Sequence, residues 1–408
     1  MKILIVTQWF NPEPNNMKAL AFAKKLQALG NEVQVVTGFP NYPIGKIYEG
    51  YKLRLHKKEE MEGVTVHRVY LYPSHDKNKW KRMANYFSFG LSARFFSRFF
   101  LKGKFDVVYV YHPPITSTLA AFSIARRKKA KVVLDVNDLW PDSIAATGMM
   151  SNQKMIKFID KWCKKAYKKA DVINVLSDGI KALLIERGVP SEKIHVIPVW
   201  CNEELLTKEK DEDFYKKHDC ANKLTLMYAG AMGAAQGLDV LVEVAEMLKK
   251  KEDIQILLVG TGTCAEDLRQ DIENKQLTNI KVLPPVPAEQ VCSILNCADV
   301  LFVHLKNDEL WKVTIPSKIP LYMALEKPII AGLQGDAAKI VDTSRGGIVC
   351  ESGNAEQIQN AILQIYNMNC SEREQMAKNG LEYYHNFLSF DSGVNKFNEI
   401  FIGLQKED

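Results

Sequence analysis

Residues 224–262 read LTLMYAGAMGAAQGLDVLVEVAEMLKKKEDIQILLVGTG. Two short runs in this stretch, Leu224–Ala229 and Ile254–Val259, are apolar at most consecutive positions rather than only at alternate ones. Such runs are typical of strands that are buried on both faces, as in a parallel sheet. A loop with three glycines follows the first run, and a helix-length segment follows that loop. The stretch therefore predicts a strand, a helix and a second strand.

The same alternation of buried strand and helix continues through the rest of the chain. The strands expected in the first half are Lys2–Val6, Glu32–Thr37, Val64–Tyr70, Val107–Tyr111, Lys131–Val136, Val172–Leu176 and Ile194–Pro198. The remaining strands expected in the second half are Ile280–Leu283, Val300–Val303, Pro328–Ala331 and Gly347–Val349. Helical segments such as Ala19–Leu29 and Met155–Lys169 separate the strands. This order is characteristic of doubly wound α/β domains.

The alternation stops once, at the polar and charge-dense stretch Trp200–Asn222, which we interpret as an interdomain linker. A chain of 408 residues is long enough for two domains of about 200 residues each. We expect two Rossmann-like, doubly wound parallel-sheet domains over residues 1–200 and 201–386. A last helix, over about residues 387–408, is expected to pack back on the first domain. Ligands of such folds bind at the carboxyl ends of the strands, so we expect the site in a cleft between the domains.

Charge is divided unequally between the two halves. Residues 1–200 contain 33 Lys and Arg against 16 Asp and Glu, a net charge of +17. Residues 201–408 contain 21 against 32, a net charge of −11. A basic half indicates contact with an anionic surface, and both nucleic acid and anionic lipid would fit. No recognised nucleic-acid-binding module is present, so we expect no nucleic-acid partner.

The sequence lacks the patterns that indicate secretion, a membrane-spanning helix or a metal site. The chain opens with MKILIV, which predicts a buried strand, and shows neither a signal-peptide pattern nor an apolar stretch of about 20 residues. None of the eight cysteines forms a CxxC pair, and no DxD motif ends a strand. We therefore expect a cytoplasmic protein that uses no metal and no cofactor.

Glycines gather after two strands of the second half. Gly230, Gly233 and Gln236 follow the first strand, and Gly260 and Gly262 follow the next. Glycine allows the backbone to approach a ligand closely, so both loops could wrap a diphosphate with their amides. A flexible turn explains the first loop equally well. The full GxGxxG fingerprint is absent, which argues against a nicotinamide cofactor.

The stretch Ile315–Ala324 contains a second candidate for anion binding. Pro316 and Ser317 predict the start of a helix, with Ser317 able to cap it. Lys318 then lies in the first turn, where a cation is unfavourable for the helix dipole. An anionic ligand would explain this lysine better than an exposed position in solvent would.

The first half offers a candidate acid–base residue. Asp138 follows a buried strand directly, and Trp140 and Pro141 would stiffen its loop. An acidic side chain at this edge could hold or deprotonate the hydroxyl of a substrate. The alternative is a helix N-cap, a role that Asp142 or Ser143 could fill equally well.

The segment Trp80–Phe100 interleaves aromatic residues with Arg82, Arg94 and Arg98. It is too basic to span a bilayer, but it suits the interface of an anionic membrane. A second basic segment, Lys154–Lys169, carries seven lysines and strengthens this interpretation. The alternative is a pair of core helices with a basic outer face.

Taken together, these motifs resemble the retaining GT-B glycosyltransferases of family 4. The bacterial N-acetylfucosamine transferases of O-antigen and capsule assembly are the most similar subgroup, and the resemblance covers nearly the whole chain. It rests on Gly38–Pro43 with Gly45 and Ile47-Tyr48, on Asp138–Pro141, on Tyr228–Gly230 with Ala235–Asp239, and on Pro316–Lys318.

The resemblance implies retaining, metal-independent transfer of a sugar from a UDP-sugar to a lipid diphosphate-linked glycan. N-acetylated deoxysugars are among the candidates for the transferred sugar. The reaction would belong to cell-surface polysaccharide biosynthesis at the inner face of the plasma membrane. The first domain would bind the acceptor and the second the nucleotide sugar. The candidate residues are Asp138, Asn137 and Glu309 for catalysis, and His112 and Trp140 on the acceptor side. Those for the donor are Asn15, Asn16, Gly230, Gly233, Gln236, Gly260, Gly262, Thr314, Ser317 and Lys318.

The sequence departs from the family pattern at positions that usually carry charge. Ala231 and Gln236 stand where most members have Arg and Lys, and Val313 and Leu321 stand where most have two glutamates. Asn137 replaces the usual histidine. The hypothetical local substitutes for the missing groups are Lys318, Lys312, Asp308 and Glu309.

The loop after the first strand departs from the family as well, because Asn15 and Asn16 stand where two glycines are usual. Asparagine adopts left-handed backbone angles more readily than other non-glycine residues, so the turn is still expected. The missing glutamates also leave open a catalytically silent homologue that partners an active transferase. A GT-B-fold sugar epimerase would need acid–base groups that the sequence offers mainly at His112.

Overall fold

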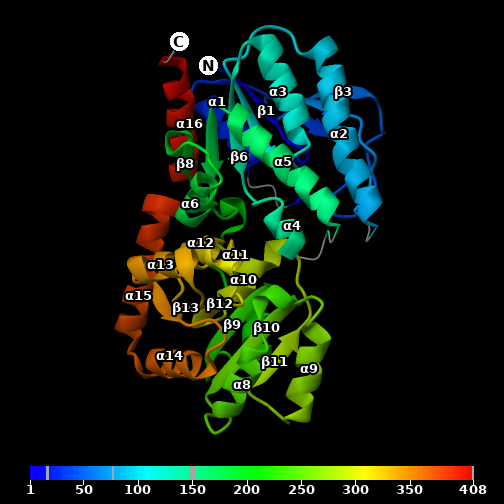
Figure 1. Cartoon of the computed structure of the whole chain (residues 1–408). Helices are drawn as coiled ribbons and strands as arrows, with labels where there is room; N and C mark the ends of the chain where they lie inside the picture. The colour runs from blue at the N-terminus through cyan, green and yellow to red at the C-terminus, as the bar shows by residue number, and fades with distance from the viewer. Residues whose placement is uncertain (15–17, 76–77, 147–149, 151, 407–408) are drawn as a thin grey trace. The chain divides into compact units, whose positions relative to one another are not determined.

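A computed structural model of the chain describes residues 1–14, 18–75, 78–146, 150 and 152–406 (Figure 1). The chain forms two compact units. The first unit consists of Met1–Pro198 together with Gly393–Asp408, and the second unit is Val199–Ser392.

The first unit contains an eight-stranded sheet with the order β3-β4-β2-β1-β5-β6-β7-β8. Its strands are β1 Lys2–Val6, β2 Glu32–Gly38, β3 His56–Met61, β4 Val64–Val69, β5 Val107–His112, β6 Lys131–Val136, β7 Val172–Val175 and β8 Ile194–Val196. All neighbours pair in parallel except β3, which runs antiparallel to β4. The carboxyl ends of the seven parallel strands therefore meet at one edge of the sheet.

The sequence analysis missed β3. Its residues HKKEEM are polar, and the strand pairs only with β4 at the end of the sheet. An edge strand exposes one side to solvent and lacks the continuous apolar run of the other strands.

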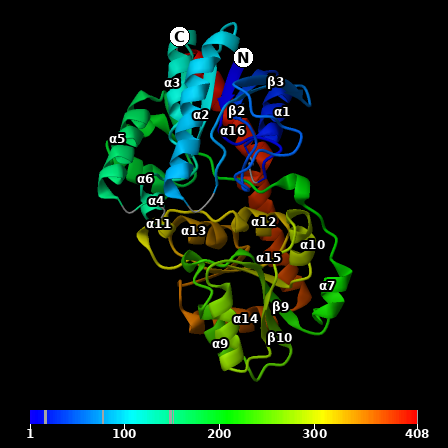
Figure 2. The ribbon, with the colours of Figure 1, turned by 90° about the vertical axis from the view of Figure 1, so that its right-hand side faces the viewer.

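Helices of the first unit are α1 Leu20–Ala28, α2 Lys79–Phe100, α3 Ser117–Lys128, α4 Asp142–Ala146, α5 Gln153–Lys169, α6 Asp178–Glu186, the 3₁₀ turn η1 Ser191–Lys193, and α16 Phe390–Lys406. Helices α2 and α3 lie side by side (Figure 2). The segment Trp80–Phe100 lies within the single helix α2 and is not a pair of helices. The Asn78 side chain caps the N-terminus of α2. Its residues Tyr86, Phe89 and Ala93 are buried in the core.

The last helix of the chain, α16, packs on the first unit beside α1 (Figure 1). The Phe397 ring lies 5.4 Å from the Phe22 ring and 5.6 Å from the Tyr109 ring, centroid to centroid. The side-chain amide of Asn31 also donates to Asn398 at 2.9 Å. A segment at the end of the sequence therefore completes the core that the first residues begin.

The second unit contains a six-stranded, wholly parallel sheet with the order β11-β10-β9-β12-β13-β14. Its strands are β9 Leu224–Ala231, β10 Ile254–Thr261, β11 Ile280–Leu283, β12 Val300–His304, β13 Ile329–Gly332 and β14 Gly347–Cys350. Its α-helices are α7 Glu212–Lys217, α8 Val240–Met247, α9 Ala265–Asn274, α10 Val291–Leu295, α11 Glu309–Lys312, α12 Lys318–Ala324, α13 Gly335–Ser344, α14 Ala355–Asn367 and α15 Cys370–Tyr383. Shorter turns are η2 Glu203–Leu205, η3 Ala234–Gln236, η4 Ala288–Gln290 and the π-helical η5 Tyr384–Leu388.

Successive residues of these strands enter two different hydrophobic cores. Leu226, Tyr228 and Ile256 belong to one core, whereas Met227 and Leu257 belong to the other. Side chains alternate between the faces of a strand, so both faces of this sheet are covered. That is why the strands are continuous apolar runs. The prediction of two Rossmann-like, doubly wound α/β domains is confirmed.

The interpretation of Trp200–Asn222 as a linker is wrong, because this stretch folds into η2 and α7 and packs on the second unit. Cys201 and Cys220 are each only 4% exposed and belong to its core. The side-chain amide of Asn296 donates to the carbonyls of Thr207 and Glu209 at 2.7 and 3.0 Å. These hydrogen bonds anchor polar backbone that the composition alone assigns to solvent.

Candidate active site

Strands β9 and β10 each have a glycine as their second-to-last residue, because their backbones approach very closely there. Gly230 and Gly260 are register partners, and a Cβ atom on Gly260 would lie 2.0 Å from the Gly230 carbonyl oxygen. One on Gly262 would lie 2.3 Å from the Met232 carbonyl oxygen. Gly230 and Gly260 also have φ of +141° and +150°, which side chains disfavour. We call this region, Gly230 to Gly233 with Gly260 and Gly262, the glycine edge.

The loop after β9 is closed by its own side chains. Gln236 Oε1 accepts a hydrogen bond from the Gly233 backbone N–H at 2.9 Å. The buried ring of His304 joins this loop to another: its Nδ1 lies 2.7 Å from the Gln236 carbonyl, and Gly353 N–H donates to its Nε2 at 2.9 Å. Gln236, expected to bind the donor, therefore shapes the loop. His304 was missed because a single histidine at a strand end has no distinctive pattern.

Lys318 reaches the glycine edge from the first turn of α12. Its Nζ lies 4.8 Å from the centroid of the Tyr228 ring, and a Cβ atom on Gly230 would lie 2.7 Å from it. Burial lowers the pKa of Lys318 to about 8. Within the described part of the chain no carboxylate pairs with this ammonium. Such a half-buried, unpaired cation beside a row of backbone amides is suited to bind an anion.

The other donor and catalytic candidates in the second unit are either exposed or bonded to neighbouring residues. Ser317 is exposed and its side chain makes no capping hydrogen bond to α12, so the predicted cap is wrong. The Thr314 hydroxyl donates to the Leu310 carbonyl at 2.8 Å. Glu309, proposed for catalysis, has an 89% exposed side chain and pairs with Lys312 at 2.6 Å.

In the first unit the acceptor-side candidates lie where β5 and β6 end. The His112 ring is fully buried, and its centroid lies 5.6 Å from that of Trp140. Neither ring nitrogen has a hydrogen-bond partner among the described residues. Burial lowers the pKa of His112 to about 4, so the ring is neutral at physiological pH. Burial also raises the pKa of Asp138. Hydrogen bonds within its turn act in the opposite direction and reduce this rise.

Asn137 belongs to a buried polar network that the sequence analysis did not foresee. The Lys18 ammonium donates to Asp135 at 2.8 Å and to Asn137 Oδ1 at 3.1 Å, and Asn137 Nδ2 donates to Asp135 at 2.8 Å. Tyr109 and Asn174 also donate to the Asp135 carboxylate. The amide of Asn137 is thereby held from both ends, which fixes its orientation at the edge of the sheet.

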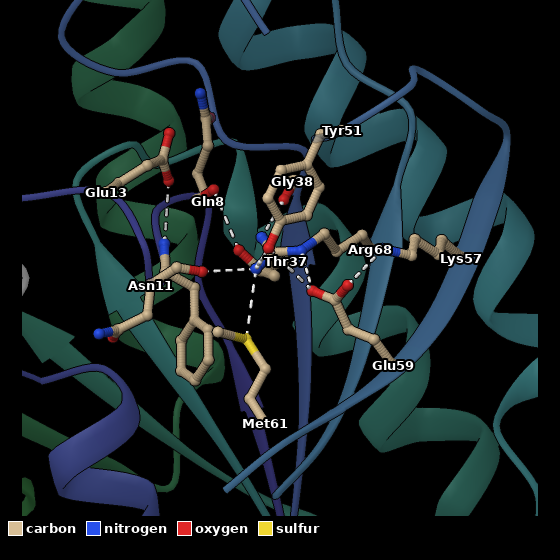
Figure 3. A network of polar contacts seen from close by, with 11 residues as sticks. Gln8, Asn11, Glu13, Thr37, Gly38, Tyr51, Lys57, Glu59, Met61 and Arg68 are labelled. Atoms are coloured by element: carbon tan, nitrogen blue, oxygen red, sulfur yellow. Dashed lines mark hydrogen bonds and ion pairs between the residues drawn. The ribbon is translucent and has the colours of Figure 1, made fainter. Parts of the chain in front are cut away.

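A second buried network positions the loops after β1 and β2 (Figure 3). The Arg68 guanidinium, fully buried, donates to the carbonyls of Gly38 and Asn11 and pairs with Glu59. Charge-assisted bonds of this kind are strong and directional. Arg68 therefore ties both loops to strand β4.

Glu13 joins the same two loops from the other side. Its carboxylate accepts hydrogen bonds from the backbone N–H groups of Phe10, Asn41 and Tyr42 at 3.0, 2.8 and 2.9 Å. Burial raises the pKa of Glu13 to about 7, although these donors and Arg68 act in the opposite direction. The motif that begins at Gly38 is thus held rigidly at the carboxyl edge.

Two further expectations concern the loop after β1 and the binding of a metal ion. Asn15 and Asn16, proposed to bind the donor, lie outside the described residues. Within the described ranges, no three or more His, Cys, Asp or Glu side chains gather so as to hold a metal ion.

Two family models match the two units. Residues 17–200 match a glycosyl transferase 4-like domain, and residues 223–368 match the glycosyl transferases group 1. Both matches fall on the sheets whose carboxyl edges carry the candidate residues.

Similar proteins extend over most of the chain. WcaI of Escherichia coli K12, a candidate colanic acid biosynthesis glycosyl transferase, is 24% identical over 361 residues, which cover 86% of this chain and 88% of WcaI. The uncharacterized glycosyltransferase MJ1069 of Methanocaldococcus jannaschii is 23% identical over 338 residues, which cover 82% and 84% of the two chains.

Solved structures share the fold over the full length. Anabaena HepE, solved with UDP-glucose, has a TM-score of 0.71 at 15% identity and covers 99% of this chain and 100% of its own. Sucrose-phosphate synthase of Thermosynechococcus elongatus has a TM-score of 0.71 at 15% identity, with 100% of each chain covered. The chain is therefore a GT-B glycosyltransferase, with a glycosyl transferase 4-like domain followed by a group 1 domain.

Proposed function

We propose that this glycosyltransferase uses a UDP-sugar as donor and binds its diphosphate at the glycine edge of the second unit. The environment of Lys318 is the main support for this proposal. A half-buried ammonium with no paired carboxylate in the described chain is costly unless an anion binds there. The glycines of the edge add backbone without side chains, which a diphosphate could approach closely.

The comparisons support UDP as the nucleotide. HepE was solved with UDP, with UDP and glucose, and with UDP-glucose, and a trehalose-6-phosphate structure from E. coli is bound with UDP-2-fluoro glucose. Ligands of doubly wound sheets bind at the carboxyl ends of the strands, so the carboxyl edge of the second sheet is the natural place for this nucleotide.

Lys318→Ala tests the donor site. We expect UDP binding, measured by isothermal titration calorimetry, to weaken by about 1.5–3 kcal/mol, because a charge-assisted bond to the diphosphate is lost. Lys378→Ala, which removes an exposed lysine of α15 in the same unit, is the matched control and should leave the affinity unchanged. Equal UDP affinities of the Lys318 variant and the wild-type protein would refute the donor site.

For the acceptor we propose a lipid diphosphate-linked glycan in the assembly of a cell-surface polysaccharide. The sugar would be transferred with retention and without a metal, as the family resemblance implies. Asp138 would hold the acceptor hydroxyl at the edge of the first sheet. WcaI, a candidate enzyme of colanic acid biosynthesis, supports a cell-surface polysaccharide as the product class.

A membrane-bound acceptor is supported by the outer face of α2. Leu91, Phe95 and Phe99 are 54%, 52% and 68% exposed although they are large and apolar. They recur at intervals of four residues, so they share one side of the helix. None of the described helices is long and apolar enough to cross a membrane. Exposed rings on one side of a basic helix are suited to enter the headgroup layer of a bilayer.

Three arginines without acidic partners lie on or against α2: Arg98 lies 5.9 Å from the centroid of the Phe95 ring, and Arg127 donates to the Arg94 carbonyl. No carboxylate in the described ranges pairs with Arg94, Arg98 or Arg127. Burial lowers the pKa of Arg127, and the neighbouring charges of Arg98 and Arg94 add to this shift. Mutual repulsion of this kind is relieved by a phosphate that binds among the three side chains.

Vesicle co-sedimentation tests the membrane contact. The wild-type protein should bind anionic phosphatidylglycerol vesicles at low salt, bind them less at high salt, and not bind neutral phosphatidylcholine vesicles. Phe95→Ser with Phe99→Ser should reduce the binding. Phe387→Ser, which removes a phenylalanine of the second unit that is 51% exposed, should not. Equal binding to both lipids would contradict the proposal.

A further inference from the structure

Six aromatic side chains form an unbroken series of ring contacts in the first unit. The centroid distances are 4.7 Å for His75–Tyr42, 5.6 Å for Tyr42–Trp9, 6.2 Å for Trp9–Tyr86, 6.1 Å for Tyr86–Trp140 and 5.6 Å for Trp140–His112. We call this series the aromatic row.

The row follows the carboxyl edge of the sheet. Trp9, Tyr42, His75 and Trp140 follow strands β1, β2, β4 and β6, and His112 ends β5. Tyr86, Trp140 and His112 at one end of the row are buried, whereas Trp9, Tyr42 and His75 at the other end are half-buried. The row therefore leads from a buried end near the catalytic candidates to an end that solvent reaches.

A chain of side-chain amides runs alongside three of these rings. Gln8 Nε2 donates to Asn85 Oδ1 at 2.5 Å, and Asn85 Nδ2 donates to Asn41 Oδ1 at 3.2 Å. Each amide residue directly precedes a ring of the row in the sequence, namely Trp9, Tyr86 and Tyr42. The hydrogen bonds between the amides therefore join the same three chain segments as the ring contacts, and they hold the rings in place.

Two residues beside or within the aromatic row keep buried polar atoms without a partner among the described residues. Gln8 is fully buried, and its Oε1 has no hydrogen-bond partner among the residues described. The same holds for both ring nitrogens of His112. Leaving such atoms unpaired is costly, so a ligand that brings hydroxyl groups to a ring-lined surface would be stabilised.

We propose that the half-buried end of the aromatic row, formed by Trp9, Tyr42 and His75, is a stacking subsite for a pyranose ring of the acceptor. A pyranose has apolar C–H faces, which pack on the negative face of an aromatic ring, and a rim of hydroxyl groups that can donate and accept hydrogen bonds. That the sugar is an acceptor rests on the proposed function, but the stacking subsite does not require it.

The polar groups beside the rings favour a sugar over the lipid chain of the acceptor. A prenyl chain would pack on the rings but would bring no hydrogen-bond donor to Gln8, the residue that precedes Trp9. The backing amides also make this edge polar between its rings, whereas a site for a lipid chain would be apolar throughout. The exposed phenylalanines of α2, described above, are the surface suited to lipid.

Saturation-transfer NMR on the full-length protein without donor tests the subsite. The probes are methyl β-D-glucopyranoside, methyl β-D-galactopyranoside and methyl N-acetyl-β-D-glucosaminide. We expect saturation of the ring C–H protons of one or more of them. Trp9→Ala should weaken this binding about tenfold, because the stacking partner is lost. Trp9→Phe should retain it. Trp80→Ala, which removes a tryptophan that is 73% exposed on α2, is the matched control and should have no effect.

The subsite is overturned if no glycoside binds to the wild-type protein, or if Trp9→Ala and Trp80→Ala behave alike. Binding of geranyl phosphate that depends on Trp9, without binding of any glycoside, would also overturn it and assign the row to the lipid chain. Thermal unfolding checks that each variant is folded, and Tyr42→Leu replaces Trp9→Ala if that variant is not. UDP calorimetry in parallel separates the two proposals, since loss of UDP binding would refute the donor site and leave the glycoside result intact.

Discussion

The strands of the first sheet end in buried charges, amides and rings, whereas two strands of the second sheet end in glycine backbone beside one ammonium. In the first unit Lys18, Asp135 and Arg68 are buried and tied to several partners. In the second unit Gly260 leaves no room for a side chain at the glycine edge. Apart from the edge strand β3, both sheets are parallel, so on the proposed function the difference reflects what each edge would recognise.

The diphosphate is the same in every nucleoside diphosphate sugar, and backbone amides can bind it once glycine lets them approach. An acceptor differs from one glycosyltransferase to the next, and only side chains can distinguish one sugar from another. The structure of the second edge therefore depends on room for a close backbone approach. The structure of the first edge depends on hydrogen-bond partners for its buried polar groups.

The largest expected effect comes from removing a buried charge in the first unit. Lys18→Met leaves the buried Asp135 carboxylate without its cation, and we expect a loss of about 3–5 kcal/mol in the free energy of unfolding by urea. Asp135→Asn added to this variant should restore part of the loss. Lys24→Met, which removes one partner of the exposed pair with Glu62, serves as the control. Similar losses for the two single variants would show that the buried network does not support this edge.

A single methyl group should disrupt the edge of the second unit. Gly260→Ala places a Cβ atom against the Gly230 carbonyl at a positive φ, so we expect a loss of about 3 kcal/mol in the free energy of unfolding. Gly353→Ala is the control, because its φ of +78° is also positive but no atom lies within 4 Å of the added Cβ. We expect about 1 kcal/mol for that variant. If the two variants lose the same amount, the close approach of β9 and β10 is not limiting.

Asp138→Asn should separate the two edges functionally. We expect turnover to fall about a hundredfold while the affinity for the UDP-sugar stays near that of the wild-type protein, because Asp138 belongs to the first unit. Steady-state kinetics and calorimetry measure the two quantities. Asp178→Asn, at an exposed position of the same unit, is the control. A parallel fall in UDP-sugar affinity would place Asp138 on the donor side instead.

The smallest expected effect is a pH dependence confined to the second unit. On the proposed function the ammonium form of Lys318 binds the diphosphate, and burial lowers the pKa of this lysine to about 8. UDP affinity should therefore be constant well below pH 8 and fall by at most about tenfold per pH unit as the pH rises above it. Calorimetry from pH 7 to pH 10 measures this, and Lys318→Arg should remove the dependence because arginine stays charged. The same slope in that variant would assign the titration to another group.

Much of the fold could be predicted because buried parallel strands carry their signal locally. The runs Lys2–Val6, Lys131–Val136 and Ile280–Leu283 coincide with β1, β6 and β11. The polar edge strand β3 gave no such run. The stretch Trp200–Asn222 misled because its anchors are hydrogen bonds to α10 and the residues after it, which no local pattern reveals.

The candidate site divides in the same way. The glycine edge could be predicted because glycine after a strand is a local signal. The polar networks of the first unit could not, because their partners are distant in the sequence: Lys18 and Asp135 are 117 residues apart, and Gln8 and Asn85 are 77 apart. A lysine or glutamine read alone is assigned to the surface, and only the folded chain shows that it is paired and buried.

The position of α16 has a consequence for the biosynthesis of the protein. The ribosome makes residues 1–198 first, yet Phe397, which packs on Phe22 and Tyr109, is made last. At about 5–20 residues per second, the intervening unit of 194 residues takes about 10–40 s to translate. During that interval the nascent first unit exposes the apolar surface that α16 later covers, and the second unit, whose residues are contiguous, can fold before the first is complete. The unit that is translated first is thus the one that is finished last.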